Sequence, residues 1–192
     1  AVSDFMKQHE ELHVELDLND RVIDVVDEGF DLVVRITKMP DSSLIARKIA
    51  PLRVVICASP EYWKKHGKPR HPSDLSNHDC LLYTYLISGN EWSFNGPDGV
   101  TTVKVSGKFK ANNGDALRSA ARNGLGVLVT PTFITHDDLK TGLLEPVLVD
   151  YHDTMSGIYL VYPHNRHLSA KVRLFVDYLV ERFSPNPPWD EL

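Results

Sequence analysis

The sequence predicts an α/β fold, because helical and strand-like hydrophobic patterns alternate along the first third of the chain. Apolar residues recur at helical spacing over 2–6, and the segment HVELDL (13–18) alternates apolar and polar residues as a strand does. A helix is predicted over 21–28 and a strand over 30–36. Because consecutive strands are joined through a helix, we expect them to pair in a parallel sheet.

The remaining elements follow from turn signals and period changes. The segment 44–60 has the pattern of one or two strands, with Pro51 as the interruption. The segment 92–113 predicts a hairpin, because two β-patterned stretches flank the turn Gly-Pro-Asp-Gly. The other predicted elements are a short helix at 61–65, a helix at 115–123 capped near Asn113, a strand at 125–131, a short helix at 132–138, a strand at 156–163 and an amphipathic helix at 169–183.

Composition and charge limit the classes of protein to which this chain could belong. The chain has 192 residues, 42% hydrophobic and 24% charged, which is enough apolar material for one sizeable core or two small ones. Its formal net charge of −5 argues against direct binding of nucleic acid, which normally needs a basic face. No apolar run approaches the ~18 residues of a membrane span. The opening AVSDFMKQHEEL begins inside an amphipathic pattern, so we expect a piece of a longer chain.

Three features that could indicate a metal, redox or cofactor site have plainer explanations. Residues 9–13, HEELH, match a zinc-protease motif that requires both histidines on one helix, but the strand-like alternation from His13 argues against that helix. Cys57 and Cys80 both adjoin apolar runs; buried thiols of a cytosolic chain are favoured, and a disulfide stays open. The glycines at 124–126 follow a helix and open a strand, which inverts the dinucleotide-binding order. We therefore expect no metal, no cofactor and no enzyme.

Polar residues at predicted strand ends are the candidates for ligand binding. Arg35 and Thr37 end one strand, and Asn19 follows the segment before it. Ligands of open α/β sheets bind beyond the carboxyl ends of parallel strands, where a following helix also offers backbone N–H groups. Arg35 taken alone could equally bind a structural carboxylate.

Several segments together resemble a known family. They are RVIDVVDEGFDLVVRI, DSSLIARKI, VVICASPEYWKKHGKPRHPSDLSNHDCLLY, WSF, NNGDALRSAARNGLGVLVTP, LLEPVL and VYPHNRHLSAKVRLFVDYL, in this order. The chain resembles the effector-binding domain of bacterial LysR-type transcriptional regulators from about residue 5 to about residue 183. The family's helix-turn-helix domain, and the strand that opens its regulatory domain, would precede residue 1.

The resemblance implies two Rossmann-like α/β lobes joined by two crossing strands, similar to type 2 periplasmic binding proteins. Lobe I would hold residues 1–56 and 162–192, and lobe II residues 57–161, with the crossings near 56–59 and 159–162. The Pro-rich tail 184–192 is expected to be mobile.

The resemblance also implies a small effector in the cleft between the lobes, and we expect it to be anionic because Arg35 is the one charged residue among the expected contacts. The expected contacts are Asn19, Arg35 and Thr37 from lobe I and Tyr83, Thr84, Asn113 and Thr130 from lobe II, whereas Asp31 is expected to be structural. The domain would form a homodimer in the cytoplasm, with the first helix and HVELDL against the 115–123 helix of the partner. DNA would be contacted only through the preceding domain, and no membrane is expected.

Three alternatives stay open at this point. The first is a solute-binding protein of a transporter, which shares the two-lobed fold. The second is a hydrolase or metalloprotein built on HEELH. The third is a domain that binds no ligand and serves only for dimerisation.

Overall fold

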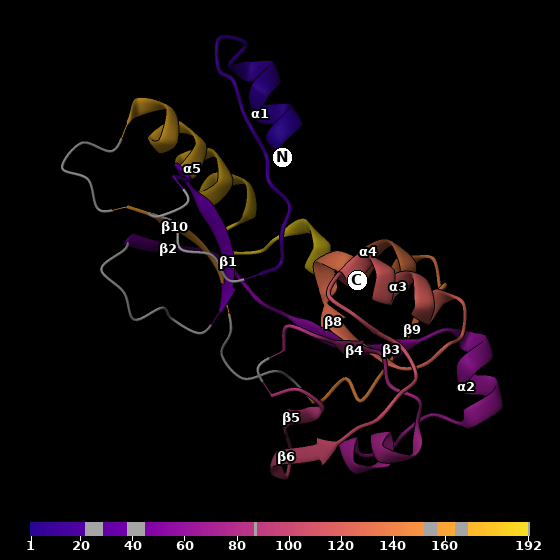
Figure 1. Cartoon of the computed structure of the whole chain (residues 1–192). Helices are drawn as coiled ribbons and strands as arrows, with labels where there is room; N and C mark the ends of the chain where they lie inside the picture. The colour runs from indigo at the N-terminus through magenta and orange to yellow at the C-terminus, as the bar shows by residue number, and fades with distance from the viewer. Residues whose placement is uncertain (22–28, 38–44, 87, 152–156, 164–168, 192) are drawn as a thin grey trace. The chain divides into compact units, whose positions relative to one another are not determined.

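The computed structural model describes residues 1–21, 29–37, 45–86, 88–151, 157–163 and 169–191 (Figure 1). The chain divides into two compact units. Unit 1 comprises Ala1–Leu52 and Met155–Pro188, and unit 2 comprises Arg53–Thr154 and Trp189–Leu192. The helix predicted over 21–28 lies almost entirely outside the described residues.

The sheet of unit 1 has three strands in the order β1-β10-β2. These are β1 (Val33–Thr37), β10 (Gly157–Tyr162) and β2 (Ile45–Pro51), and both pairs are antiparallel. The prediction of parallel pairing is therefore wrong for these strands. The reason is that the chain returns from unit 2 as β10. This strand lies between β1 and β2, which are neighbours in sequence, and it runs antiparallel to both.

Two helices build the core of unit 1 on this sheet. Helix α5 (Ala170–Phe183) contacts β2, and its Val172, Val176 and Leu179 are buried as the hydrophobic pattern predicted. Helix α1 (Val2–Gln8) packs on α5 through the buried Phe5, whose ring centroid lies 4.8 Å from that of Phe175. The contact joins segments from opposite ends of the chain (Figure 1).

The predicted strand HVELDL is not a strand in the structure. Residues 12–20 form no regular element, and Leu16 and Leu18 are 58% and 85% exposed. None of the described strands pairs with this segment. A period-two pattern becomes a strand only where a neighbouring ladder takes up its backbone hydrogen bonds, so the pattern alone was not sufficient.

Unit 2 is built around β3, which lies between β8 and β9 with antiparallel pairing on both sides. A short parallel pair, β4-β7, adjoins this sheet through a parallel bridge between Cys80 and Val127. The bounds of these strands are β3 (Val54–Ala58), β4 (Leu82–Tyr83), β7 (Lys110–Ala111), β8 (Leu128–Pro131) and β9 (Glu145–Val147).

The helices α2, α3 and α4 and the hairpin of unit 2 lie where the sequence predicted them, whereas the two 3-10 helices were not predicted. Ser59 caps α2 by accepting a hydrogen bond from the backbone of Tyr62, and Asn113 caps α3 in the same way. The bounds are α2 (Pro60–His66), η1 (Pro72–Asn77), β5 (Glu91–Gly96), β6 (Gly99–Lys104), α3 (Gly114–Arg122), α4 (Thr132–Lys140) and η2 (Pro188–Asp190). The aromatic core of this unit contains Tyr62, Trp63, Trp92 and Phe94.

The divisions between the units lie earlier in the chain than the predicted lobe boundaries. They follow Leu52 rather than residue 56, and Thr154 rather than residue 161. Strand pairing explains the difference: β3 bonds only to strands of unit 2, and β10 only to strands of unit 1, among the described strands. In the tail, Pro188–Asp190 forms a 3-10 turn, in which the Asp190 side chain contacts Thr132 and the Trp189 carbonyl contacts His136.

Candidate functional site

Three of the predicted effector residues gather at the carboxyl ends of the parallel pair β4-β7. Tyr83 lies opposite Ala111, and the N–H of Thr84 donates to the carbonyl of Ala111 at 2.9 Å. Asn113 follows two residues later and begins α3, where its Oδ1 accepts from the N–H of Ala116 at 3.0 Å. This is the strand-end and helix-start arrangement at which α/β proteins bind ligands.

A pocket of about 360 Å³ opens beside Tyr83 and Thr84, and Asn113 is not among the residues that line it. Its lining consists of Leu82, Tyr83, Thr84, Gly89, Asn90 and Lys110. The carboxamide of Asn90 donates to the carbonyl of Val105 at 3.0 Å, which fixes one polar wall. Lys110 adds a positive charge, so the pocket carries a group suited to an anion.

Sequence reasoning missed Lys110 and Asn90. A signal for Lys110 was present, because it stands one residue before the end of a β-patterned run that leads into a helix cap. Asn90 carried no such signal, since it lies in a turn and reaches the pocket only through the approach of the 88–90 turn to β6.

Thr130 does not line the pocket. It is a buried residue of β8, 4% exposed, and it pairs with Val55 of β3. Its side chain is therefore part of the interior of unit 2, two residues before the start of α4.

The three predicted residues of unit 1 lie on two segments. Arg35 is half-buried in β1 opposite Tyr159, and Thr37 ends that strand opposite Gly157. Asn19 is exposed in the irregular segment, where its Oδ1 accepts from the N–H of Arg21 at 3.0 Å. Asp31 forms an exposed ion pair with Lys171 at 2.9 Å, which agrees with a structural role at the other end of the strand.

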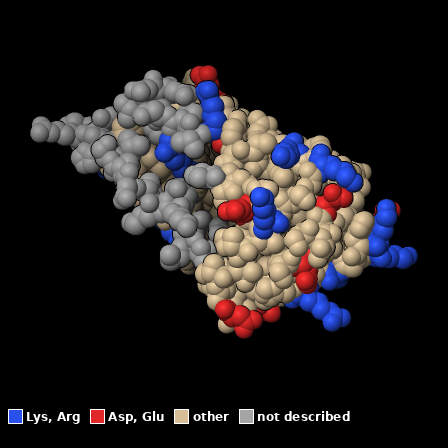
Figure 2. Space-filling model, turned by 60° about the horizontal axis from the view of Figure 1, so that its bottom comes forward, with Lys and Arg blue, Asp and Glu red and all other residues tan. Residues whose placement is uncertain are grey.

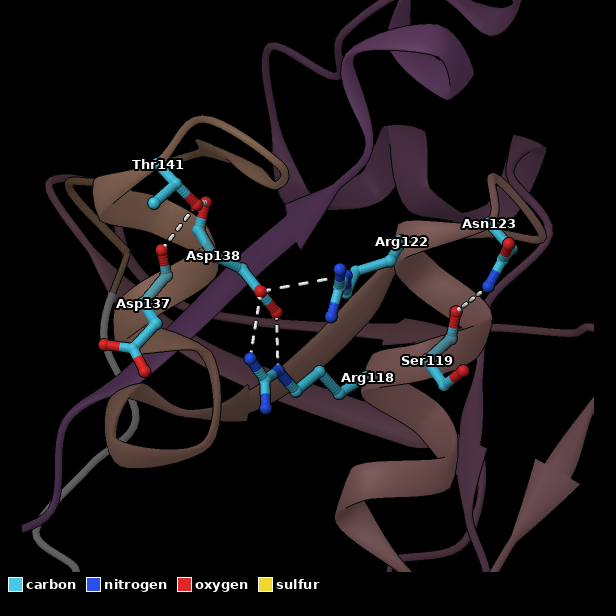
Figure 3. Close-up of polar contacts among 7 residues, drawn as sticks. All are labelled: Arg118, Ser119, Arg122, Asn123, Asp137, Asp138 and Thr141. Carbon is cyan, nitrogen blue, oxygen red and sulfur yellow. Dashed lines mark hydrogen bonds and ion pairs between the residues drawn. The ribbon is translucent and has the colours of Figure 1, made fainter.

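A buried ion pair holds α3 against α4 (Figure 3). Helix α3 begins after Asn113, and α4 begins after Pro131. The Asp138 carboxylate is 2% exposed and accepts hydrogen bonds from Nε and one terminal nitrogen of Arg118, with Arg122 beside it at 3.8 Å. The hydrogen bonds from Arg118 to Asp138 raise the pKa of that guanidinium. This bidentate geometry fixes the orientation of both helices.

The two thiols and the HEELH segment do not form reactive sites. Burial raises the pKa of Cys57 and of Cys80 to about 12, so neither is a thiolate at neutral pH. Helix α1 ends at Gln8, so His9 and His13 do not share a helix. Among the described residues, no group of three or more histidine, cysteine or acidic side chains could hold a metal ion.

The surface charge is mixed. On the face shown in Figure 2, acidic and basic side chains of the described residues are interspersed. Of the helices in the described ranges, none has the length and apolar character needed to cross a membrane.

Comparisons with known proteins agree on one family. Residues 1–184 match the LysR substrate binding domain. An uncharacterised HTH-type transcriptional regulator of Haemophilus influenzae is 39% identical over 168 residues, which are 88% of this chain and 58% of that protein. The chain thus spans about three fifths of the length of this relative.

Solved structures show the same relationship. The regulatory domain of CrgA, a LysR-type transcriptional regulator from Neisseria meningitidis, has a TM-score of 0.84 and 29% identity, covering 95% of this chain and 90% of that one. Full-length AphB, a virulence activator of Vibrio cholerae, has a TM-score of 0.83 and 32% identity, covering 95% of this chain and 62% of that one.

These matches confirm the fold predicted from the resemblance, a two-lobed α/β fold of the type 2 periplasmic-binding-protein kind. They also cover nearly all of the segments on which that resemblance depended. The chain belongs to the LysR substrate-binding domain family.

Proposed function

We propose that the chain is the effector-sensing regulatory domain of a LysR-type transcriptional regulator and that it binds a small anionic metabolite. The observation that carries the proposal is the pocket at the carboxyl ends of β4-β7, where Tyr83, Thr84 and Lys110 form part of the lining. It lies in a domain whose family is named for substrate binding. Polar groups that converge in a concave site are the usual mark of a small-molecule site.

The proposed contacts of the effector come from both lobes. Tyr83, Thr84 and Asn113 would contribute from unit 2, and Asn19, Arg35 and Thr37 from unit 1, whereas the buried Thr130 is left out of the set. Arg35 is the charged member of this set, and its planar guanidinium suits bidentate binding of a carboxylate. Lys110 joins the set as a second cation.

The regulator would work in the cytoplasm as a dimer and would pass the ligand state to a DNA-binding domain in the full-length protein. The relatives named above are transcriptional regulators, which does not favour the solute-binding alternative. That these relatives are regulators also supports a role other than catalysis for this chain.

A thermal-shift screen on the full-length protein tests the proposal. A ligand that binds the native state must raise the unfolding temperature, so small carboxylates should do so and the matching neutral amides should not. Arg35→Ala should remove the shift, whereas Arg173→Ala, at an exposed position of α5, should retain it. An unchanged shift in Arg35→Ala would remove Arg35 from the site, and no shift with any carboxylate would count against an anionic effector.

A further inference from the structure

The C-terminal turn Pro188–Asp190 places a carboxylate at the start of α4. Asp190 Oδ1 accepts a hydrogen bond from the hydroxyl of Thr132 at 2.6 Å, and Oδ2 lies 3.4 Å from Nε of Arg53. Although it comes from the end of the chain, the Asp190 side chain is only 5% exposed. A carboxylate is seldom buried to this extent unless its site suits an anion.

Helix α4 supplies the attraction for this anion. Its N-cap residue is Pro131, which makes no side-chain capping bond, and its first turn contains no acidic residue. The positive end of the helix dipole is therefore not balanced by the helix's own sequence. Asp190 supplies the missing negative charge from a distant part of the chain.

The residue before Asp190 adds an aromatic contact. The ring of Trp189 lies against Phe133 in an edge-to-face arrangement with centroids 6.0 Å apart, and the Trp189 carbonyl is 3.0 Å from Nδ1 of His136. One short segment thus presents an aromatic ring and a carboxylate to adjacent residues of the first turns of α4. A free aromatic carboxylate would carry the same two groups in one molecule.

Two buried oxygens indicate that the tail does not satisfy the site completely. Asp190 Oδ2 has no hydrogen-bond partner among the described residues, although Arg53 is near it. The hydroxyl oxygen of Thr135, on the same end of α4, is fully buried and also lacks a partner among them. Unsatisfied buried polar atoms are costly, so this contact is weaker than a well-formed internal cap.

We propose that the start of α4, together with Arg53 and Thr132, is a carboxylate-binding site that Asp190 fills in this structure. The tail is then a tethered competitor of free aromatic carboxylates, which bind by displacing Trp189 and Asp190. This inference goes beyond the proposed function, because it concerns unit 2 alone and does not depend on Arg35.

A peptide in trans tests the site directly. The probe is a labelled peptide of residues 184–192, SPNPPWDEL, and its binding to the full chain is followed by fluorescence anisotropy. Asp190→Asn in the chain removes the charge of the resident carboxylate, so this variant should bind the peptide about tenfold or more tightly than the unaltered chain. The same peptide carrying Asp190→Asn should not bind, and a chain with both Asp190→Asn and Arg53→Ala should bind neither.

A second measurement needs no altered chain. Trp63 and Trp92 are 3% and 6% exposed, so acrylamide should quench chiefly Trp189 once the tail is released. Phenylacetate should increase the quenching, and its neutral amide, phenylacetamide, should not.

Equal peptide binding by the unaltered and Asp190→Asn chains, or quenching that phenylacetate leaves unchanged, would overturn the site and leave Asp190 as a structural cap. The proposed function would survive either result, because its own test depends on Arg35→Ala.

Discussion

Asp138 of α4 accepts two hydrogen bonds from the guanidinium of Arg118 on α3, and it does so from a position that is only 2% exposed. The pair joins two helices that start beside candidate ligand sites, α3 at Asn113 and α4 after Pro131. By holding α3 against α4, the pair helps to keep the polar groups near the starts of the two helices in place before a ligand arrives. Such positioning lowers the entropic cost of binding.

Asp138→Asn should destabilise the protein by about 2–4 kcal/mol. Breaking a buried ion pair by removing one partner leaves an uncompensated charge, and Arg118, which keeps 27% exposure, can recover part of its hydration. Urea unfolding followed by circular dichroism measures the loss. Asp137→Asn is the matched control at an exposed neighbouring position and should change stability by less than about 0.5 kcal/mol. Equal losses in both variants would contradict the assigned role.

The protein should lose stability as the pH falls below about 6.5, and His78 should be the main cause. Burial lowers the pKa of His78 from its usual 6.5, with a further contribution from His66. The unfolded chain then binds a proton that the folded chain resists, so the free energy of unfolding decreases as the pH falls through this window. The His78 ring is enclosed by Tyr62, whose hydroxyl lies 3.3 Å from Nδ1, and by Trp63.

Urea unfolding at pH 7.5 and at pH 5.5 checks this pH dependence. His78→Gln should reduce the difference in stability between the two conditions, and His13→Gln, at an exposed site, should leave it unchanged. Asp74, whose pKa is lowered by hydrogen bonds from the backbone of Arg70 and His71, acts in the same direction only in the more acidic range below its usual 3.8. If the stability difference between pH 7.5 and pH 5.5 is the same in His78→Gln as in the unaltered protein, another group causes the pH dependence.

Local signals predicted the parts of the fold that depend on neighbouring residues. The hairpin β5-β6 follows from its turn, where Gly99 adopts a φ of 96° that other residues rarely take. The start of α3 follows from the capping side chain of Asn113. The family resemblance then supplied the two-lobed architecture, which no local pattern contains.

Contacts between distant segments could not be predicted in the same way. The position of β10 between β1 and β2 is decided by the return of the chain, and it turned an expected parallel sheet into an antiparallel one. HVELDL shows the reverse case, since its alternation is suitable for a strand and no described strand pairs with it. The contact of Asp190 with Thr132 joins residues 58 positions apart, and the Pro-rich composition of the tail gave no sign of it.

Lys110→Ala should weaken the binding of an anionic effector about tenfold. Lys110 belongs to the lining of the pocket that also contains Tyr83 and Thr84, and a charge-assisted contact is of about this strength. Isothermal titration with a carboxylate found in the thermal-shift screen gives the affinity. Lys104→Ala removes an equivalent exposed charge from β6, outside the pocket lining, and should bind the ligand normally. If both variants bind alike, the pocket is not the effector site.

Ser119→Arg should shift the domain from dimer to monomer. Of the small residues on α3, Ala120 and Ala121 are buried inside unit 2 and Ala116 is half-buried, whereas Ser119 is exposed and allows close approach of a partner helix. On α1 the exposed Met6 offers an apolar contact for such a partner. A two-fold interface repeats each contact, so one Arg introduces two charges into an interface that should bury about 1,200–2,000 Å². Light scattering at micromolar concentration measures the mass, and Asp98→Arg in the hairpin turn is the control that should remain dimeric. A monomeric mass for the unaltered domain would refute the proposed pairing, and a dimeric mass for Ser119→Arg would move the interface away from α3.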